Sequence, residues 1–516
     1  MGSLMKTVVL LCVISSVLCT PFINKLQPGQ EWPTRSSVKQ PYHQFDEIEN
    51  GTISDTVATE VAANEEKAPE NNKPKAKEDD VERIDYSGAQ VWKVSTKKSN
   101  AHRVINQLAS EKLIASWGGN HTSIDILVKP KAVENVTATL KNKDIAYYIM
   151  IEDLQQRIDE ENPPLDENEL ELQDRRARAY NFWRYRESHR RLGFISAYMG
   201  YNSLNLPMEY WPNANWGHRM TWKQYHRLED IHGFLDYLAK TYPSIVSVNS
   251  IGKSHEGRDL KVLRISDGKK TNKAVFIDGG IHAREWISPA VVTYFINQFA
   301  ENFDVESDDI RNIDWYFLPV VNPDGYEYTH KTDRLWRKNR RGFGGCAGAD
   351  LNRNFGYQWG GKGASRYPCS EIYRGSGPFS EPESKAIAQF FKSTGADFSA
   401  YLTYHSYGQY LLYPWGYDNA LPPDHKNLET VGKMMAQAIQ KTGGSEYKVG
   451  SSRGLLYPAA GGSDDWAKSL NIKYTYTIEL SDTGRYGFVL PASYIEPVAR
   501  ENLAGLRVLA SQVNKE

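Results

Sequence analysis

Residues 273–286 read KAVFIDGGIHAREW, a short apolar run that stops at two glycines and then places a histidine and a glutamate three residues apart. The run is apolar and strand-like, which predicts a buried strand. Ligands of open α/β folds bind just beyond the carboxyl ends of strands, so His282 and Glu285 stand where a metal site would be assembled. The same spacing occurs in ordinary polar turns, and these two residues alone leave both interpretations open.

The candidate for a third ligand is His405, which follows a second strand-like segment, AYLTY at residues 400–404. Zinc readily accepts two histidine nitrogens and one carboxylate and keeps a fourth position for water. A single histidine at the end of a strand more often has a structural or solvated role. The three residues His282, Glu285 and His405 therefore predict a zinc site only in combination.

From residue 220 onward the chain alternates between helix-like and strand-like segments. The strands are apolar with little alternation, as expected where helices cover both faces of a sheet. This pattern predicts an α/β fold. The predicted helices cover residues 229–242, 290–303, 380–393 and 427–441, and the predicted strands cover residues 273–280, 314–322, 399–407 and 473–481.

The region before residue 220 divides into three parts. Residues 20–85 are polar and rich in acidic side chains, with few large apolar residues, which predicts a disordered extension. Residues 86–160 contain strand-like and helix-like segments in an order that predicts a small α/β sandwich. Residues 161–219 form a charged connector that proteases can reach, with basic pairs at Arg175-Arg176 and Arg190-Arg191.

The first 19 residues have the features of an export signal. Lys6 precedes an apolar run from Val8 to Leu18, which is followed by small residues. The run is well short of the ~20 residues that a membrane-spanning helix needs, so we interpret it as a signal peptide and expect a secreted, soluble protein. Three Asn-x-Thr triplets, at Asn50, Asn120 and Asn135, are candidate glycan acceptors in such a protein.

Two of the four cysteines, Cys12 and Cys19, lie in or at the end of this signal. Cys346 and Cys369 remain, and in an oxidising compartment a single pair is most simply a disulfide. Two free buried thiols are the alternative. The formal net charge of -1 gives no electrostatic reason to expect nucleic acid or a membrane surface as a partner.

Six motifs make the chain recognisable as similar to a known family. HAREW, NPDGY, DLNRNF, HSYGQYLLYPWGY, YPAAGGSDDW and IELSDTGRYGF occur in the order and approximate spacing of the zinc metallocarboxypeptidases of the pancreatic carboxypeptidase A/B type. The resemblance spans residues 220–516, and residues 86–160 resemble the inhibitory prodomain of that family. It implies a mixed, mostly parallel central sheet, a monomeric exopeptidase with one Zn²⁺ per catalytic domain, and a disulfide between the two remaining cysteines.

The resemblance also implies a role for each matching residue. The implied zinc ligands are His282, Glu285 and His405. The implied catalytic residues are the general base Glu479 and the oxyanion-stabilising Arg337, which match IELSDTGRYGF and RLWRKNR. The implied substrate-binding residues are Asn352, Arg353 and Tyr457 for the terminal carboxylate, and Arg284 and Tyr407 for the upstream subsites. Gripping a terminal carboxylate selects an exopeptidase over an endopeptidase.

Two adjacent aspartates in GGSDDW bear on which terminal residue is removed. Matching the motif ends puts Asp465 on a structural position and Asp464 on the floor of the specificity pocket, where carboxypeptidase B-like enzymes carry an aspartate that pairs with Lys or Arg. The alternative is that Asp464 faces water or is neutral. Gly416 occupies the position where the regulatory branch places its aspartate, which favours the digestive branch. Ser481 departs from the arginine common in pancreatic relatives, and this leaves the pocket electrostatics open.

The sequence thus predicts a secreted zymogen whose prodomain covers the cleft until a trypsin-like protease cuts the connector, at Arg219 or Arg191. Its substrates would be peptide or protein C-termini ending in Lys or Arg. A carboxypeptidase A-like preference for aromatic or aliphatic ends is the runner-up. An inactive peptide-binding fold is a remote third. Such a fold would have lost a metal ligand or the general base, and the predicted ligands and catalytic residues are all present. No role can be assigned to the extension at residues 20–85.

Overall fold

The computed structural model describes residues 82–173 and 218–516, all of which belong to the second of the two units, residues 1–75 and 76–516, into which the chain divides. The signal sequence, most of the predicted extension, the basic pairs of the connector and Asn50 lie outside the described residues. No helix within the described ranges is long and apolar enough to cross a membrane.

An N-terminal sandwich packs two helices against a four-stranded antiparallel sheet with strand order β2-β3-β1-β4. Its elements are β1 (Gln90–Ser95), α1 (Ala101–Ser110), β2 (Ile114–Gly119), β3 (Ser123–Val128), α2 (Val133–Asn142) and β4 (Tyr147–Ile151). β2 was not among the elements predicted from sequence. It reads IASWGG, and its register against β3 shifts between Ser116 and Gly118, so it lacks the regular alternation that marks a strand. A further helix, α3 (Leu154–Glu161), follows β4.

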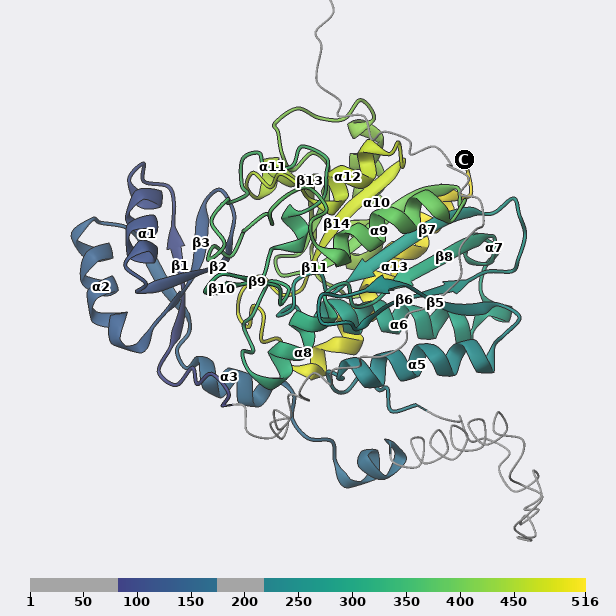
Figure 1. Ribbon diagram of the computed structural model, residues 1–516, viewed down its shortest axis with the longest axis horizontal. Helices are drawn as coiled ribbons and strands as arrows, with labels where there is room; N and C mark the ends of the chain where they lie inside the picture. Colours follow the sequence, from purple (N-terminus) through teal and green to yellow (C-terminus); the bar gives the residue numbers. More distant parts are fainter. Residues whose placement is uncertain (1–81, 174–217) are drawn as a thin grey trace, which may run out of the picture. The chain divides into compact units, whose positions relative to one another are not determined.

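The second part of the described chain is built on an eight-stranded mixed sheet with strand order β13-β12-β14-β11-β7-β8-β6-β5 (Figure 1). The four central strands, β14, β11, β7 and β8, run parallel, and antiparallel pairs lie toward both edges. The strands are β5 (Val246–Lys253), β6 (Asp259–Ile265), β7 (Lys273–Gly279), β8 (Ile313–Leu318), β11 (Phe398–Ser406), β12 (Tyr410–Tyr413), β13 (Lys448–Ser451) and β14 (Tyr474–Leu480). The predicted α/β class with a mixed, mostly parallel sheet is therefore confirmed.

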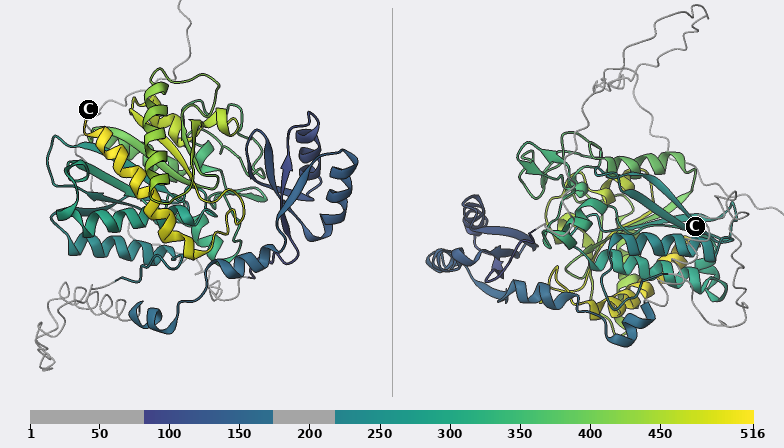
Figure 2. Two further views of the ribbon diagram at one scale, coloured as in Figure 1. Left: turned by 180° about the vertical axis from the view of Figure 1, so that it is seen from behind. Right: turned by 60° about the horizontal axis from the view of Figure 1, so that its bottom comes forward.

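Helices cover both faces of this sheet. Along β7, Val275 and Ile277 point into one core, while Ala274 and Phe276 point into the other. The first core is closed by α5 (Leu228–Thr241), α6 (Ile287–Glu301), α10 (His425–Lys441) and α13 (Ile495–Val513), and the second by α9 (Pro382–Ser393) and α12 (Ser463–Ser469). Figure 2 shows the yellow helix α13 crossing the first face. Because both faces are buried, the central strands are apolar throughout.

The register of the central strands brings three carboxyl ends together. His405 of β11 lies opposite Glu479 of β14, and Tyr404 lies opposite Gly279, the last residue of β7. The segments that leave these strands therefore start side by side at one edge of the sheet, which is where ligands bind in open α/β folds.

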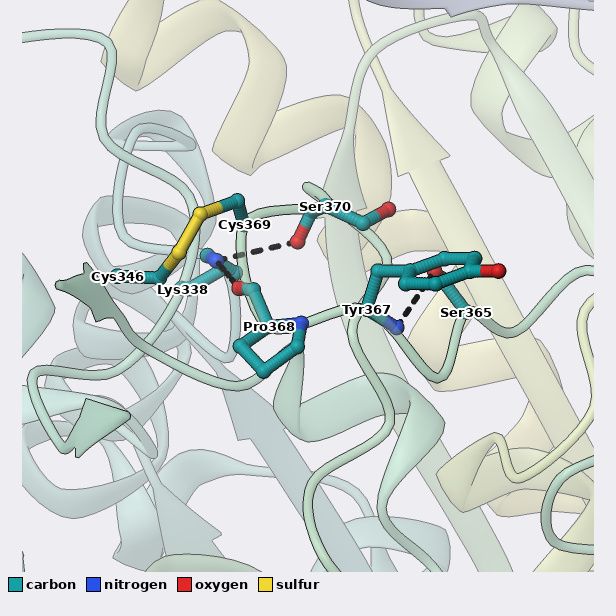
Figure 3. Close-up of a disulfide and its surroundings, with 7 residues drawn as sticks. All are labelled: Lys338, Cys346, Ser365, Tyr367, Pro368, Cys369 and Ser370. Carbon is teal, nitrogen blue, oxygen red and sulfur yellow. Dashed lines mark hydrogen bonds between the residues drawn. A yellow bond between two sulfur atoms is a disulfide. The ribbon is translucent and has the colours of Figure 1, made fainter. Parts of the chain in front are cut away.

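The disulfide predicted between Cys346 and Cys369 is formed, with Cα atoms 5.1 Å apart (Figure 3). Beside it, the Nζ atom of Lys338 donates hydrogen bonds to the carbonyl oxygens of Pro368 (2.9 Å) and Ser370 (3.1 Å). These hydrogen bonds tie the loop closed by the disulfide to Lys338, the residue that directly follows the predicted site residue Arg337.

Candidate active site

Two glycines set the path of the chain between β7 and the first candidate ligands. A Cβ atom on Gly279 would lie 2.7 Å from Ser288 Oγ. Gly280 has φ +65°, and a Cβ atom there would lie 2.9 Å from Pro289 Cγ. Only glycine tolerates this approach and this backbone conformation. Ser288 Oγ also donates to the carbonyl oxygen of Tyr404 (2.6 Å), so the turn holds residues 282–285 against the end of β11.

His282, Glu285 and His405 meet in one buried cluster, and their ligand atoms all lie within 4.8 Å of one another. Glu285 Oε1 lies 2.7 Å from His282 Nδ1, and Glu285 Oε2 lies 3.0 Å from His405 Nδ1. The two Nδ1 atoms are 3.1 Å apart. The structure thus brings together three residues that come from two segments more than one hundred positions apart in the sequence.

The outer nitrogen of each histidine has its own partner. His282 Nε2 lies 3.2 Å from Asp350 Oδ1, and His405 Nε2 lies 3.2 Å from Thr403 Oγ1, which in turn donates to Asp278 Oδ1 (2.7 Å). A carboxylate and a hydroxyl whose proton is already donated can only accept, so each Nε2 carries the imidazole proton. In the neutral imidazoles, which are the forms that bind a metal ion, both Nδ1 atoms are then left with lone pairs that face each other.

This arrangement fits a zinc ion. Two unprotonated nitrogens and a carboxylate, all buried and directed at one point, repel one another unless a cation lies between them, and they form a donor set that zinc prefers. His282, Glu285 and His405 would hold the ion. When bound, zinc polarises a substrate carbonyl and lowers the pKa of water toward about 7.

A half-buried carboxylate and a buried cation flank the ligand cluster. Burial raises the pKa of Glu479 to about 7, which suits a group that exchanges protons near neutral pH. Arg337 donates to Asp350 Oδ2 through Nη2 (2.9 Å) and Nε (3.2 Å). Burial opposes the charge of Arg337, but Asp350, Tyr457 and Glu285 together outweigh it and hold the pKa of the guanidinium above its usual range. Arg337 is therefore a fixed positive charge beside the ligands.

Three further predicted residues come from two segments: Asn352 and Arg353 are neighbours in a short 3-10 helix, Leu351–Arg353, and Tyr457 lies on a separate loop. Asn352 Oδ1 accepts from the backbone N–H of Ser463 (2.8 Å), which leaves the amide nitrogen of Asn352 to donate. Arg353 is buried and donates to the carbonyl oxygens of Gly363 (2.8 Å) and Asn352 (2.8 Å), which fixes its guanidinium. Tyr457 differs from both because its side chain is 41% exposed, but it lies near enough to Arg337 to contribute to the raised pKa of that guanidinium.

The adjacent aspartates at the start of α12 have different surroundings. Asp465 accepts from the backbone N–H groups of Gly416 (2.8 Å) and Tyr417 (3.0 Å), so it fixes a neighbouring loop. Asp464 is buried and accepts from Ser452 Oγ (3.2 Å). No lysine or arginine within the described ranges lies within ion-pair distance of Asp464. The two carboxylates are therefore not interchangeable.

Ser481, which stands where pancreatic relatives commonly carry arginine, belongs to a separate cluster of hydrogen-bonded side chains. Its hydroxyl lies 3.3 Å from Glu501 Oε1 and 3.2 Å from Ser445 Oγ. Glu501 belongs to α13, and Ser445 lies in the loop between α10 and β13. Ser481 therefore forms hydrogen bonds with that cluster, and none with the aspartates of α12.

The N-terminal sandwich reaches two of the predicted substrate-binding residues. Tyr407 donates its hydroxyl to Asp125 Oδ2 (2.6 Å), and Arg284 Nη2 donates to the carbonyl oxygen of Trp117 (3.4 Å). The Trp117 ring also packs edge-on against Phe488, with 5.2 Å between ring centroids. Side chains of the sandwich thus occupy the surface around Arg284 and Tyr407.

A second contact joins α3 to the part of the chain that is built on the eight-stranded sheet. Glu161, the last residue of α3, is buried and accepts from Arg334 through both carboxylate oxygens, one at 2.6 Å from Nε. Arg334 also donates to the carbonyl oxygens of Arg284 (2.9 Å) and Phe488 (2.7 Å). The pair therefore ties the end of α3 to the backbone that borders the candidate site.

Two residues with central positions were missed from sequence. Asp350 joins His282 to Arg337, and its signal was present in the motif DLNRNF, where it stands two residues before Asn352. Ser452 contacts Asp464 across a gap of twelve positions, and nothing in its local sequence distinguishes it from the serine before it.

A donor set that fits zinc, beside a carboxylate whose pKa is raised to about 7 and a fixed cation, suits hydrolysis, so the fold and the site together indicate a metal-dependent hydrolase. Comparison with family models narrows this class. The model "Zinc carboxypeptidase" matches residues 231–505, and "Carboxypeptidase activation peptide" matches residues 92–161. The chain therefore belongs to the zinc carboxypeptidase family. It is a zinc-dependent metallo-exopeptidase preceded by an activation peptide, which confirms the predicted enzyme class and cofactor.

Relatives of both specificity types are similar to this chain. Carboxypeptidase B of Astacus astacus is 46% identical over 57% of this chain and 98% of its own length. Carboxypeptidase A1 of Bos taurus is 36% identical over 82% of this chain and 93% of its own length. The crystal structure of thrombin activatable fibrinolysis inhibitor superimposes with a TM-score of 0.69 at 33% identity, covering 84% of this chain and 100% of that chain.

Proposed function

We propose that this chain is the zymogen of a secreted carboxypeptidase that removes C-terminal lysine or arginine from peptides and proteins. The observation that carries the basic preference is the surroundings of Asp464. Its carboxylate is buried, accepts one hydrogen bond from Ser452, and has no cationic partner within the described ranges. A lysine or arginine side chain of a substrate would supply that partner.

The energetic cost of the alternative supports this preference. A buried carboxylate left unpaired beneath a phenylalanine or leucine side chain costs about 3 kcal/mol or more, which is about a hundredfold in kcat/KM. Gly416, the position where the regulatory branch carries its aspartate, supplies no charge here. A side chain at this position would also be crowded, because a Cβ atom there would lie 3.3 Å from the carbonyl oxygen of Ala459. The preference therefore depends on Asp464.

In the proposed reaction each remaining residue has a separate task. Glu479 takes a proton from the attacking water and returns one to the leaving amine. Arg337 stabilises the negative charge that develops on the scissile carbonyl oxygen. Asn352 and Arg353 bind the terminal carboxylate, with the exposed Tyr457 closing over it, and this contact restricts cleavage to chain ends.

In this proposal the zymogen is inactive because the sandwich occupies the surface that would bind the substrate residues upstream of the scissile bond. The sandwich contacts Arg284 and Tyr407, so a peptide cannot extend past the scissile bond while the sandwich is docked. A trypsin-like cut in the basic connector, at Arg219 or Arg191, would sever the link between the two parts. Export through the predicted signal peptide brings the protein to the extracellular space where such proteases act.

The test is to treat the purified zymogen with trypsin and measure kcat/KM on otherwise identical peptides ending in Arg, Lys and Phe. We expect at least a hundredfold preference for Arg and Lys over Phe, and activity that is lost on adding phenanthroline. Equal turnover of all three peptides, or a preference for Phe, would reject the role of Asp464 and leave a carboxypeptidase A-like enzyme.

A further inference from the structure

The hydroxyl of Ser452 has two acceptors for one proton. Ser452 Oγ lies 3.2 Å from Asp464 Oδ2 and 3.3 Å from the carbonyl oxygen of Tyr413. A serine hydroxyl donates a single hydrogen bond, so it can satisfy only one of them at a time. Ser452 is itself buried, so water does not compete freely for this proton.

The charge on the two acceptors decides between them. Hydrogen bonds to an ionised acceptor are shorter and stronger than those to a neutral carbonyl. The proton of Ser452 is therefore directed to Asp464 when that carboxylate is ionised, and this fixes one of its two oxygens. The other oxygen is then left for a cation that enters the pocket.

Asp464 has no comparable restraint from elsewhere. Its neighbour Asp465 is held by backbone N–H groups of Gly416 and Tyr417, whereas Asp464 accepts, within the described ranges, from Ser452. The terminal torsion of an aspartate is broad, so a carboxylate without a donor can rotate away from the orientation that pairs with a cation.

We propose that Ser452 is a positioning residue that orients the Asp464 carboxylate for the lysine or arginine side chain of the substrate. This inference rests on the proposed function, because it assigns Asp464 the same role. Ser452 acts through Asp464 before any chemistry occurs, so its loss weakens substrate binding and leaves the chemical step intact.

The decisive comparison uses Ser452→Thr and Ser452→Val in the full-length, trypsin-activated protein. Threonine and valine have the same shape and differ in one hydroxyl, so crowding in the pocket affects both equally. We expect KM for peptides ending in Arg or Lys to be about tenfold higher in Ser452→Val than in Ser452→Thr, with kcat within twofold. For a peptide ending in Phe, the two variants should agree within twofold.

Ser451→Ala is the matched control. Ser451 caps the same short helix, α11 (Ser452–Leu455), by accepting from the N–H of Gly454 (3.2 Å), but it has no contact with Asp464. It should destabilise the helix and leave the ratio of Arg to Phe turnover unchanged. If Ser452→Val and Ser452→Thr behave alike, or lose Arg and Phe turnover equally, the positioning role is wrong. A wild-type enzyme without a basic preference would instead reject the proposed function itself.

Discussion

His282 and Arg337 are joined through a single carboxylate: Asp350 Oδ1 lies 3.2 Å from His282 Nε2, and Asp350 Oδ2 accepts from Arg337 Nη2 at 2.9 Å. One side chain therefore fixes the tautomer of a metal ligand and holds a cation at the site. Asp350 is fully buried, so neither contact is screened by water.

Replacing Asp350 by asparagine should weaken zinc binding by about 10–100-fold, because partners of metal-bound histidines contribute that much to affinity. The amide can still accept from His282, but it no longer balances the charge of Arg337. Zinc affinity measured by competition with a chelator checks this expectation. Asp324→Asn is the control, since Asp324 is a buried carboxylate that pairs with Arg258 away from the site. Equal zinc affinity in both variants would contradict the prediction.

Replacing Glu479 by glutamine should lower kcat by about 10²–10⁴-fold with one zinc still bound per chain, because the amide cannot exchange a proton. Steady-state kinetics and metal analysis of the activated enzyme measure both quantities. Glu501→Gln is a matched control. Burial also raises the pKa of Glu501, but its carboxylate accepts from the N–H of Ser445 (2.8 Å), in the cluster with Ser481. A drop in kcat caused by zinc loss would argue against the acid–base role.

Replacing Asp464 by isoleucine should reverse the substrate preference. The apolar side chain removes the partner of a basic terminal residue, so kcat/KM for an Arg-ending peptide should fall about a hundredfold or more, while that for a Phe-ending peptide should hold or rise. Asp465→Asn should lower the melting temperature and keep the Arg-to-Phe ratio, because Asp465 binds the backbone at Gly416 and Tyr417. An unchanged ratio in Asp464→Ile would place the specificity elsewhere.

Docking of the sandwich should depend on pH through Glu161. Burial raises the pKa of Glu161 to about 6, although Arg334 opposes the rise, whereas the ordinary value is 4.5. The docked form therefore binds more protons between these values, so docking is strongest below pH 4.5 and weakens as pH rises to about 6. The loss is at most about 2 kcal/mol.

Size-exclusion chromatography of the connector-cleaved protein between pH 4.5 and 7 measures the fraction of the sandwich that stays bound to the rest of the protein. Glu161→Gln, which cannot ionise, should abolish the pH dependence over that window. Glu160→Gln is the control, because Glu160 is exposed and pairs with Arg157 on the same helix. The prediction is wrong if Glu161→Gln keeps the pH profile of the wild type.

The apolar central strands and the amphipathic helices could be predicted because their patterns are local. The strands at residues 273–280, 399–407 and 473–481 each correspond to an observed central strand. The missed elements have weaker local signals. β2 contains two glycines and a register shift, while α13 carries Pro497 and Gly505, residues that count against a helix unless packing supports it.

The class of fold and the candidate metal ligands could be predicted from the sequence, because apolar strand-like runs and ordered motifs are local features of the chain. The partners that complete the site could not, because they meet only after folding. Asp350 reaches His282, Ser452 reaches Asp464, and Glu161 reaches Arg334 across separations that no local pattern encodes. The physical reason is that the parallel register of β7, β11 and β14 gathers segments from distant parts of the chain at one edge of the sheet.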